Sequence, residues 1–313
     1  DPILAGVTPD AVTALTITDT DGQSVSFSKE GDTWTLADSD GYPARSEKIT
    51  EILGKLVAIN TDRLVTQTAA SHDRLQVGEG NYVRKVDMTT ASGAQTLYLG
   101  SSTGASATHV RAANADATYL TSEVATWELD TLPTTWIEVA YYQVPKEQIT
   151  EVTLENANGS LSFIRGGGED GSEWTLADAT ADEPVAPANI NTLIDRIATL
   201  NLNTVLGKSE APEYGFDAPL ATLTVTTSEA TTATTTAATK TTTLVVGAKD
   251  EETNTYYLKS SDSEFYVRLA AFTGDEFVNK QRSDFMVQST EATPDSSPDS
   301  SVVPAATEPA VGV

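Results

Sequence analysis

Two stretches of the chain carry apolar residues at the spacing of one helix face. A proline, Pro43 or Pro187, stands in the loop before each of them. Both follow the steps i, i+3, i+4, i+7 and i+10, which place the apolar side chains on one stripe of a helix about three turns long. The members are Ile49, Ile52, Leu53, Leu56 and Ile59 in the first stretch, and Ile190, Leu193, Ile194, Ile197 and Leu200 in the second. The pattern predicts two amphipathic helices.

Around these helices the alternation of apolar and polar residues is typical of strands. Before each helix, two alternating stretches flank a turn sequence, Asp19-Thr20-Asp21-Gly22 or Asn156-Ala157-Asn158-Gly159, in which glycine supplies a positive φ. After each helix, four more alternating stretches follow. These lie at residues 83–89, 94–99, 108–111 and 118–121, and at 221–227, 241–246, 255–259 and 264–269. We therefore expect each helix to cover an antiparallel sheet.

A repeated pentapeptide shows that the two halves are copies. Trp34-Thr35-Leu36-Ala37-Asp38 recurs as Trp174-Thr175-Leu176-Ala177-Asp178, although the chain has only four tryptophans. Further on, Gly100 matches Gly247, and counting forward from these glycines aligns His109 with Tyr256. A register held this long is typical of a duplicated fold. The alignment predicts that Trp34 and Trp174 occupy the same position, each packed beneath its own helix.

The fold class predicted from these patterns is α+β, with two tandem homologous units, each an antiparallel sheet or meander with one amphipathic helix packed on it. The expected organisation is an N-terminal segment (1–11), a first repeat (12–142), a second repeat (143–288) and an acidic Pro/Ser tail (289–313). The second repeat contains a threonine-rich hairpin insertion at residues 226–243, where eleven of eighteen residues are threonine. The tail has four acidic residues and no basic one, a composition that predicts disorder.

Charge and composition exclude several function classes. The 313 residues include 45 Asp and Glu against 19 Lys and Arg, a formal net charge of −26. This charge disfavours binding to phosphate backbones or anionic lipid. The chain has no cysteine and two histidines, which removes disulfides, thiolate nucleophiles and the usual structural zinc sets. No apolar stretch has the length of a membrane span. The start at Asp1-Pro2 fits a processed product whose leader or anchor lay upstream, or an arbitrary boundary.

A family resemblance rests on the second repeat. There, a Trp-x-Leu strand and a short helix precede Glu213-Tyr214-Gly215-Phe216-Asp217-Ala218-Pro219, which leads into a Thr-Leu-Thr-Val strand and a Val-Val-Gly turn. This sequence resembles the bacterial domain-of-unknown-function family 4340, over residues 12–288 taken as two copies. In the first copy the signature changes to His72-Asp73-Arg74-Leu75-Gln76-Val77-Gly78. The resemblance implies an envelope protein, usually tethered by an N-terminal hydrophobic segment and often encoded beside gliding-type ABC transporter components, with no established activity.

Candidate catalytic motifs lack the surroundings that their chemistry needs. Gly100-Ser101-Ser102-Thr103-Gly104 satisfies the G-x-S-x-G pattern, but the next element is strand-like and the second copy has no serine there. His72 and His109 have no acidic or imidazole partner at a suitable spacing. The glycines at 166–168 are followed by acidic residues and no helix, which argues against a phosphate site. These patterns predict turns, and we expect no catalytic, cofactor or metal residues.

Two kinds of modification or ligand remain as alternatives. The turns that begin at Asp19 and Asp38 are similar to the opening of a calcium loop, so a structural calcium is an alternative to plain turns. Glycan attachment is the second, at Asn158 of an Asn-Gly-Ser sequence and in the threonine-rich insertion. The threonines concerned are Thr231, Thr232, Thr234, Thr235 and Thr236. Trp127 and Trp136 fall near the junction of the copies, where they could seal an interface.

The sequence thus favours a non-enzymatic, extracytoplasmic scaffold or binding protein at the periplasm or cell surface. The expected partner is an envelope protein, such as an ABC-transporter or gliding-type component, or a second copy of the chain, because open sheet edges can accept a strand from a neighbour. We expect no nucleic-acid partner. The alternative is a glycan-binding or glycan-processing envelope protein that uses the groove between the repeats.

Overall fold

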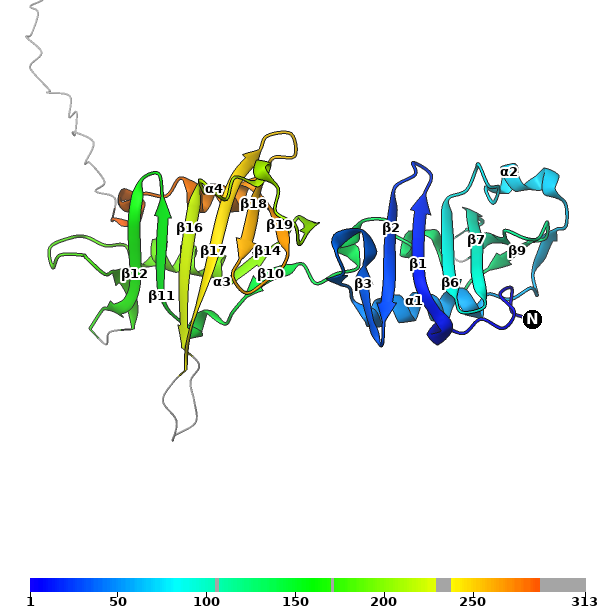
Figure 1. The fold of residues 1–313 in the computed structure, drawn as a ribbon, viewed down its shortest axis with the longest axis horizontal. Helices are drawn as coiled ribbons and strands as arrows, with labels where there is room; N and C mark the ends of the chain where they lie inside the picture. The colour runs from blue at the N-terminus through cyan, green and yellow to red at the C-terminus, as the bar shows by residue number, and fades with distance from the viewer. Residues whose placement is uncertain (105–106, 170–171, 229–237, 288–313) are drawn as a thin grey trace, which may run out of the picture.

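The computed structural model describes residues 1–104, 107–169, 172–228 and 238–287. They form two large antiparallel sheets that lie one after the other along the long axis of the molecule, each with its own helices (Figure 1). The predicted α+β class is confirmed. In the part of the chain that the structure describes, no helix combines the length and the apolar character that crossing a membrane requires.

The first sheet has nine strands in the order β4-β3-β2-β1-β6-β7-β8-β9-β5. Its strands are β1 (Val12–Asp19), β2 (Ser24–Glu30), β3 (Thr33–Leu36), β4 (Tyr42–Pro43), β5 (Leu64–Thr66), β6 (Arg84–Thr90), β7 (Gly93–Ser102), β8 (Thr108–Ala112) and β9 (Thr118–Thr121). The helices of this unit are α1 (Ser46–Ala58) and the short α2 (His72–Leu75).

The second sheet has eight strands in the order β13-β12-β11-β16-β17-β18-β19-β15. Its strands are β11 (Ile149–Asn156), β12 (Gly159–Gly167), β13 (Glu173–Leu176), β15 (Thr204–Gly207), β16 (Ala221–Ser228), β17 (Thr239–Asp250), β18 (Thr255–Ser260) and β19 (Tyr266–Ala270). The helices are α3 (Pro187–Ala198) and α4 (Ala271–Val278). A separate two-stranded sheet pairs β10 (Ala140–Gln143) with β14 (Thr199–Asn201).

The predicted turns close the first hairpin of each unit. In the first, the Asp19 carboxylate accepts hydrogen bonds from the backbone N–H groups of Asp21 and Gln23, and Gly22 has a φ of 78°. In the second, the Asn156 side chain accepts from the Asn158 N–H, and Gly159 has a φ of 119°. These side chains stabilise the turns because they satisfy backbone donors that the strands leave unpaired.

The first four members of each predicted apolar stripe are buried on its helix, whereas the fifth lies beyond the helix end: Ile59 caps α1 and Leu200 belongs to β14. Helix α1 buries Ile49, Ile52, Leu53 and Leu56, and α3 buries their counterparts from Ile190 to Ile197. A fully buried Leu or Ile contributes about 1.5–3 kcal/mol relative to an exposed one. One stripe is therefore sufficient to hold each helix on the sheet, without strong caps at its ends.

Trp34 and Trp174 occupy the same position in their two units. Trp34 is buried on β3 and Trp174 on β13. Each ring also has a cation near its face. Lys29 Nζ lies 5.9 Å from the centroid of the Trp34 ring, and the Arg165 guanidinium lies 5.4 Å from the centroid of the Trp174 ring. In both sheets this cation is the residue paired directly with the tryptophan. The duplication is thus present in three dimensions.

The strand pairing corrects one detail of the sequence alignment. Leu99 pairs with Val110 in the first sheet, and its counterpart Val246 pairs with Leu258 in the second. The residue equivalent to His109 is therefore Tyr257 and not Tyr256, because the connection before β18 is one residue longer. A shift by one residue exchanges the two faces of a strand.

Several short elements were not predicted from the sequence. Strands β5 and β15 complete one side of each sheet, and α4 follows β19 directly. The expected boundary between residues 142 and 143 falls inside β10, which pairs with β14 of the second unit. In the threonine-rich insertion, β16 and β17 stay paired as far as Ser228 and Thr239, and residues 229–237 lie outside the described part.

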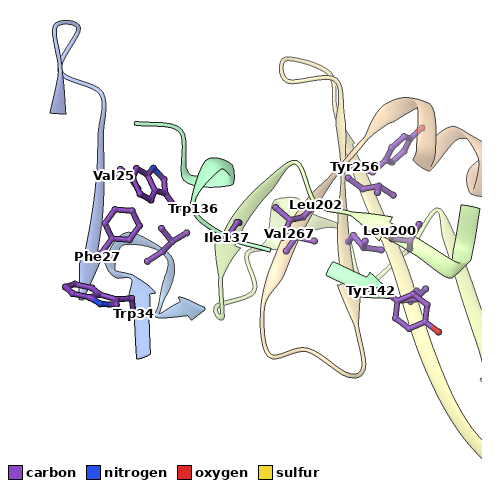
Figure 2. Close-up of a cluster of buried hydrophobic side chains, with 14 of the residues drawn as sticks. Val25, Phe27, Trp34, Trp136, Ile137, Tyr142, Leu200, Leu202, Tyr256 and Val267 are labelled. Atoms are coloured by element: carbon purple, nitrogen blue, oxygen red, sulfur yellow. The ribbon is translucent and has the colours of Figure 1, made fainter. Parts of the chain in front are cut away.

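The two units meet through a small set of contacts. The Lys208 N–H donates a hydrogen bond of 2.7 Å to Asp40 Oδ2, and the rings of Tyr42 and Phe265 pack edge to face with centroids 4.8 Å apart. One continuous cluster of buried side chains also spans both units. Figure 2 shows Phe27 and Trp136 on one side of Ile137, with Leu202 and Val267 on the other. The units are therefore joined by apolar packing as well as by the connecting chain.

Candidate binding site

The family signature forms a tight loop against the second sheet. Gly215 follows the 3₁₀ turn Pro212–Tyr214 with a φ of 71°, a conformation that favours glycine. Gly247 lies beneath this loop, and a Cβ at Gly247 would sit 2.1 Å from the Tyr214 carbonyl oxygen. Pro219 is exposed at the end of the loop. The two glycines are thus required by backbone geometry.

The first unit builds the same loop without the signature residues. Gln76 takes the place of Gly215, with a φ of 57°, and a Cβ at Gly100 would lie 2.1 Å from the Leu75 carbonyl oxygen. The matching distances identify Leu75-Gln76 as the counterpart of Tyr214-Gly215. The signature is therefore structural in both copies.

The aromatic residues of the signature are packed and do not form an open site. Tyr214 stacks on Tyr257 with ring centroids 4.5 Å apart, and the Arg268 guanidinium lies 4.9 Å from the Tyr257 ring centroid. The same guanidinium forms an ion pair with Asp250. Burial, followed by the charge of Glu213, raises the pKa of Tyr214 above its ordinary value. This cluster anchors the loop by packing.

The G-x-S-x-G segment forms the end of a strand and not a nucleophile elbow. Strand β7 runs to Ser102, and the next element is strand β8. The serine of the motif is Ser102, which pairs with Thr108 at the end of β7. The Oγ of the neighbouring Ser101 lies 3.2 Å from His109 Nδ1, but that nitrogen is also 2.7 Å from the Ser101 carbonyl oxygen. A carbonyl can only accept, so Nδ1 carries the proton and cannot act as a base toward Ser101. The Ser101 hydroxyl is within 3.2 Å of the Leu75 carbonyl oxygen, to which it donates.

The remaining polar candidates have structural partners. His72 Nε2 lies 2.9 Å from the Asp116 carbonyl oxygen. Asp19 Oδ2 accepts from the Thr131 hydroxyl, and Asp40 Oδ2 accepts from Lys208. Within the described ranges, no three Asp, Glu or His side chains gather in a way that could hold a metal. The proposed calcium thus has no pre-formed cluster at these turns.

The sites considered for glycans divide into two groups. Asn158 Nδ2 donates to the carbonyl oxygens of Asn279 and Lys280, at 3.0 and 3.2 Å, so this amide fastens the turn to the segment after α4. Residues Thr231, Thr232, Thr234, Thr235 and Thr236 lie outside the described residues.

The two tryptophans near the junction have opposite environments. Trp136 is fully buried in the first unit, packs on Phe27 with centroids 5.4 Å apart and donates from Nε1 to the Asp130 carbonyl oxygen. Trp127 is 77% exposed, in the 3₁₀ turn Thr126–Glu128 after the last meander strand. Trp127 therefore does not seal the interface between the units, and it is free to contact another molecule.

Trp127 stands between two cavities of the first unit. One, of about 270 Å³, is lined by α1 and by the segment that contains Trp127, including Lys48, Ile52 and Lys55. The other, of about 490 Å³, is lined by residues that include Ser102, Thr108 and Ser122. Trp127 and Glu128 line both cavities. An exposed indole beside a partly apolar hollow is the arrangement of a binding site.

Three charged groups of the smaller cavity, Glu51, Lys55 and Glu128, are bound to one another. Lys55 forms ion pairs with Glu51 and Glu128, and the hydrogen bonds to Glu128 and then Glu51 raise the pKa of Lys55. Burial raises the pKa of Glu128, but hydrogen bonds from the Ala125 N–H and Lys55 outweigh it and leave this pKa below its ordinary value. Lys55 and Glu128 therefore stay charged near neutral pH, which does not suit a general acid or base.

The second unit has a related but smaller feature. Phe272 in α4 is 66% exposed, and the guanidinium of Arg196 lies 5.7 Å from its ring centroid. Arg196 on α3 is the counterpart of Lys55 on α1. Arg196 and Phe272 line a cavity of about 170 Å³ in the second unit. Each unit thus has an exposed aromatic ring after its last strand, beside a cation of its helix. The sequence missed this site because its residues come from segments more than 70 positions apart.

Comparison with known proteins agrees with the duplicated fold. A search of curated proteins found no match, and neither did a search of solved structures. One family model, described as a domain of unknown function (DUF4340), matches residues 34–219 and 174–296. The two overlapping matches cover most of the chain and fit two tandem units, and the chain therefore belongs to the DUF4340 family.

Proposed function

We propose that this protein is a non-enzymatic, extracytoplasmic binding or scaffold protein that engages a protein partner at the cell envelope through the Trp127 surface. The observation that carries the proposal is the 77% exposure of Trp127 between two cavities. Tryptophan is among the residues that contribute most to binding energy at protein interfaces. The expected partner is an ABC-transporter or gliding-type component, or a second copy of the chain.

Two further observations support binding over catalysis. Ser102, the serine of the G-x-S-x-G segment, ends strand β7 and is followed by strand β8, so the segment lacks the strand-to-helix turn that a nucleophile elbow needs. Beside Trp127, Lys55 and Glu128 form an ion pair, which raises the pKa of Lys55 and helps hold the pKa of Glu128 below its ordinary value, so both stay charged. A surface with fixed charges around an aromatic residue provides orientation and contact area, which are the requirements of recognition.

Site-specific crosslinking tests this proposal. A photo-crosslinking amino acid replaces Trp127 in the full chain, and a matched variant carries it at Glu147, an exposed position of the second unit. We expect position 127 to crosslink to one defined envelope protein or to a second copy, and position 147 to give far less product. Equal and diffuse crosslinking from both positions would contradict the proposal.

A second candidate function is glycan binding at the same residue. An exposed indole face can stack on a sugar ring, and the carboxylates of Glu51, Glu128 and Asp130 line the cavity beside it as acceptors for hydroxyl groups. In this candidate function the glycan binds on the first unit, and not in the groove between the units that the sequence suggested. Titration with chitotetraose and cellotetraose, followed by the Trp127 indole N–H signal in NMR, tests it. If the Trp127 indole N–H signal does not shift at about 10 mM of either sugar, glycan binding at this residue is excluded. Such a result limits the binding free energy to less than about 3 kcal/mol.

A further inference from the structure

The two sheets differ at one edge. In the first sheet, β4 covers the outer edge of β3: Tyr42 pairs with Leu36 and Pro43 with Thr35. The Ala44 N–H donates to the Trp34 carbonyl oxygen at 2.9 Å, and the Trp34 N–H donates to Ser46 Oγ at 2.9 Å. The backbone of Trp34 is therefore fully bonded.

In the part of the chain that the structure describes, the second sheet ends at β13, with no strand in the place of β4. Val185 is the residue equivalent to Ala44, because Val185 forms an isolated β-bridge with Met286 and Ala44 forms one with Ile137. Ile190 follows Trp174 by 16 positions, whereas Ile49 follows Trp34 by 15. Because of this additional residue, the segment 182–187 keeps its bridge to Met286 without pairing with the edge of β13. Across the described ranges, no backbone hydrogen bond joins residues 182–187 to β13.

The free backbone groups of β13 point toward this gap. The Ala177 N–H donates to the Ser162 carbonyl oxygen, which fixes the bonded pairs between β12 and β13 at alternate residues. By this alternation, the N–H and C=O of Trp174 point away from β12, as those of Trp34 point away from β2. An edge with unbonded groups accepts an additional strand.

A groove of about 580 Å³ lies along this edge. Its walls are the edge of β13 from Glu173 to Leu176, the glycines at 166–168, and the segment from Ala177 to Pro187. The carboxylate of Glu183 in the groove is paired with Arg282, through two hydrogen bonds of 2.7 Å. No Lys or Arg is among the lining residues, so the groove suits an uncharged segment.

The chain itself continues from the wall of this groove. The Val287 N–H donates to the Pro184 carbonyl oxygen at 2.7 Å, and Pro184 lines the groove. Residues 288–313 follow and lie outside the described part. Their longest uncharged stretch with adjacent β-branched residues runs from 300 to 307 and contains Val303-Pro304-Ala305. This tripeptide has the same order, a large apolar residue, proline and alanine, as Tyr42-Pro43-Ala44.

We propose that Val303-Pro304-Ala305 docks on β13 as an added strand, in the register in which Tyr42-Pro43-Ala44 pairs with β3. Val303 then lies opposite Leu176 and Pro304 opposite Thr175, and the Ala305 N–H donates to the Trp174 carbonyl oxygen. Proline fits at the second position because its nitrogen faces away from β13, where no donor is needed.

The length of the connection permits this docking within one chain. Twelve residues, 288–299, separate Val287 from the uncharged stretch. Extended, they span about 40 Å at roughly 3.3 Å per residue, which exceeds the length of a four-residue strand. A tethered segment has an effective concentration in the millimolar range, which favours it over the same segment of a second copy. The docking is independent of the Trp127 surface, which lies on the other unit.

Amide hydrogen exchange of the full chain tests the proposal. We expect the Ala305 N–H, which donates to the Trp174 carbonyl oxygen in the docked chain, to exchange at least about tenfold faster in Val303→Asp than in the unchanged chain, since a charge facing Leu176 prevents docking. The control Val311→Asp changes the same tail outside the docking tripeptide and leaves the exchange of Ala305 unchanged. The Ala44 N–H, which donates to the Trp34 carbonyl oxygen, is an internal reference. Equal exchange of Ala305 in all three chains would overturn the proposal.

A cysteine pair distinguishes the source of the strand. The chain has no cysteine, so Thr175→Cys with Pro304→Cys creates a single possible pair at directly opposed positions. We expect rapid disulfide formation within the monomer, and slower formation for Thr175→Cys with Ser296→Cys. A disulfide-linked dimer would show that a second copy supplies the strand, and equal rates for the two pairs would show that the tripeptide has no preferred place. Either result overturns docking within one chain.

Discussion

The carbonyl oxygen of Tyr214 lies so near Gly247 that a Cβ added to the glycine would sit 2.1 Å from it. Gly100 has the same relation to Leu75 in the first unit. Because the obstructing atom belongs to the backbone, an alanine forces the loop away from the sheet. We expect Gly247→Ala and Gly100→Ala each to lower the free energy of unfolding by about 2–4 kcal/mol, measured by urea denaturation. Gly80→Ala is the control, since a Cβ there meets nothing within 4 Å; a similar loss in this control would contradict the explanation.

Gln76 is a non-glycine residue at a position where the second copy has glycine. Its φ of 57° carries a steric cost that glycine does not have. We expect Gln76→Gly to change stability by less than about 1 kcal/mol, with the relief of strain offset by the larger entropy of the unfolded chain. Gly215→Ala should instead destabilise the protein, because its Cβ would lie 2.9 Å from that of Ala248. Thermal unfolding of Gln76→Gly and Gly215→Ala measures the two changes in stability. Equal losses of stability in the two variants would contradict this explanation.

Glu128 connects the Trp127 surface to the acid stability of the first unit. Burial raises its pKa, but the Ala125 N–H and Lys55 outweigh burial and hold the pKa below 4.5 in the folded chain. The pKa of Glu128 is lower in the folded chain than in the unfolded chain. Its bonds to Lys55 and the Ala125 N–H therefore stabilise the folded chain above pH 4.5, and this stabilisation is lost as the pH falls through the folded pKa. We expect Glu128→Gln to cost about 1 kcal/mol near neutral pH and little at about pH 3.

The control for this prediction is Glu51→Gln. Glu51 also pairs with Lys55, but its side chain is 65% exposed, so water screens the interaction. Urea denaturation across the acid range should show a smaller loss for this variant. A pH-independent loss for Glu128→Gln would indicate that its packing, and not its charge, is what matters.

Asp40 holds the junction between the units through the Lys208 N–H. Its carboxylate oxygen would also lie 2.4 Å from a Cβ on Gly207, whose φ of 101° itself favours glycine. We expect Asp40→Ala to speed amide exchange of Lys208 about tenfold, without a comparable change at Trp34. Asp38→Ala, two positions earlier, is the matched control and should leave Lys208 unchanged.

The sequence predicted the long helices and the hairpins because each has apolar residues on one face and polar residues on the other. The stripe from Ile49 to Leu56 has one apolar face, and the hairpins have glycine turns, so period and turn chemistry agree. The alignment of His109 was wrong by one residue because its strand β8 is buried on both faces, as is most of β18. A strand without alternation contains no information on register.

The candidate site was harder to predict for a related reason. Trp127 and Trp136 occur in similar polar sequences, yet one is exposed and the other is buried against Phe27. What separates them is the position of a short turn relative to α1, a long-range property that local pattern does not encode. The short strands β4 and β5 depend in the same way on partners distant in sequence.

The most direct test of the proposed function is partner retention by a Trp127→Ala chain. Because this side chain is 77% exposed, we expect the substitution to leave the melting temperature within about 1–2 °C of the original. Binding to the partner identified by crosslinking should fall at least about tenfold, and Trp127→Phe should restore part of it. Unchanged affinity in the fully folded Trp127→Ala chain would show that the protein binds its partner elsewhere.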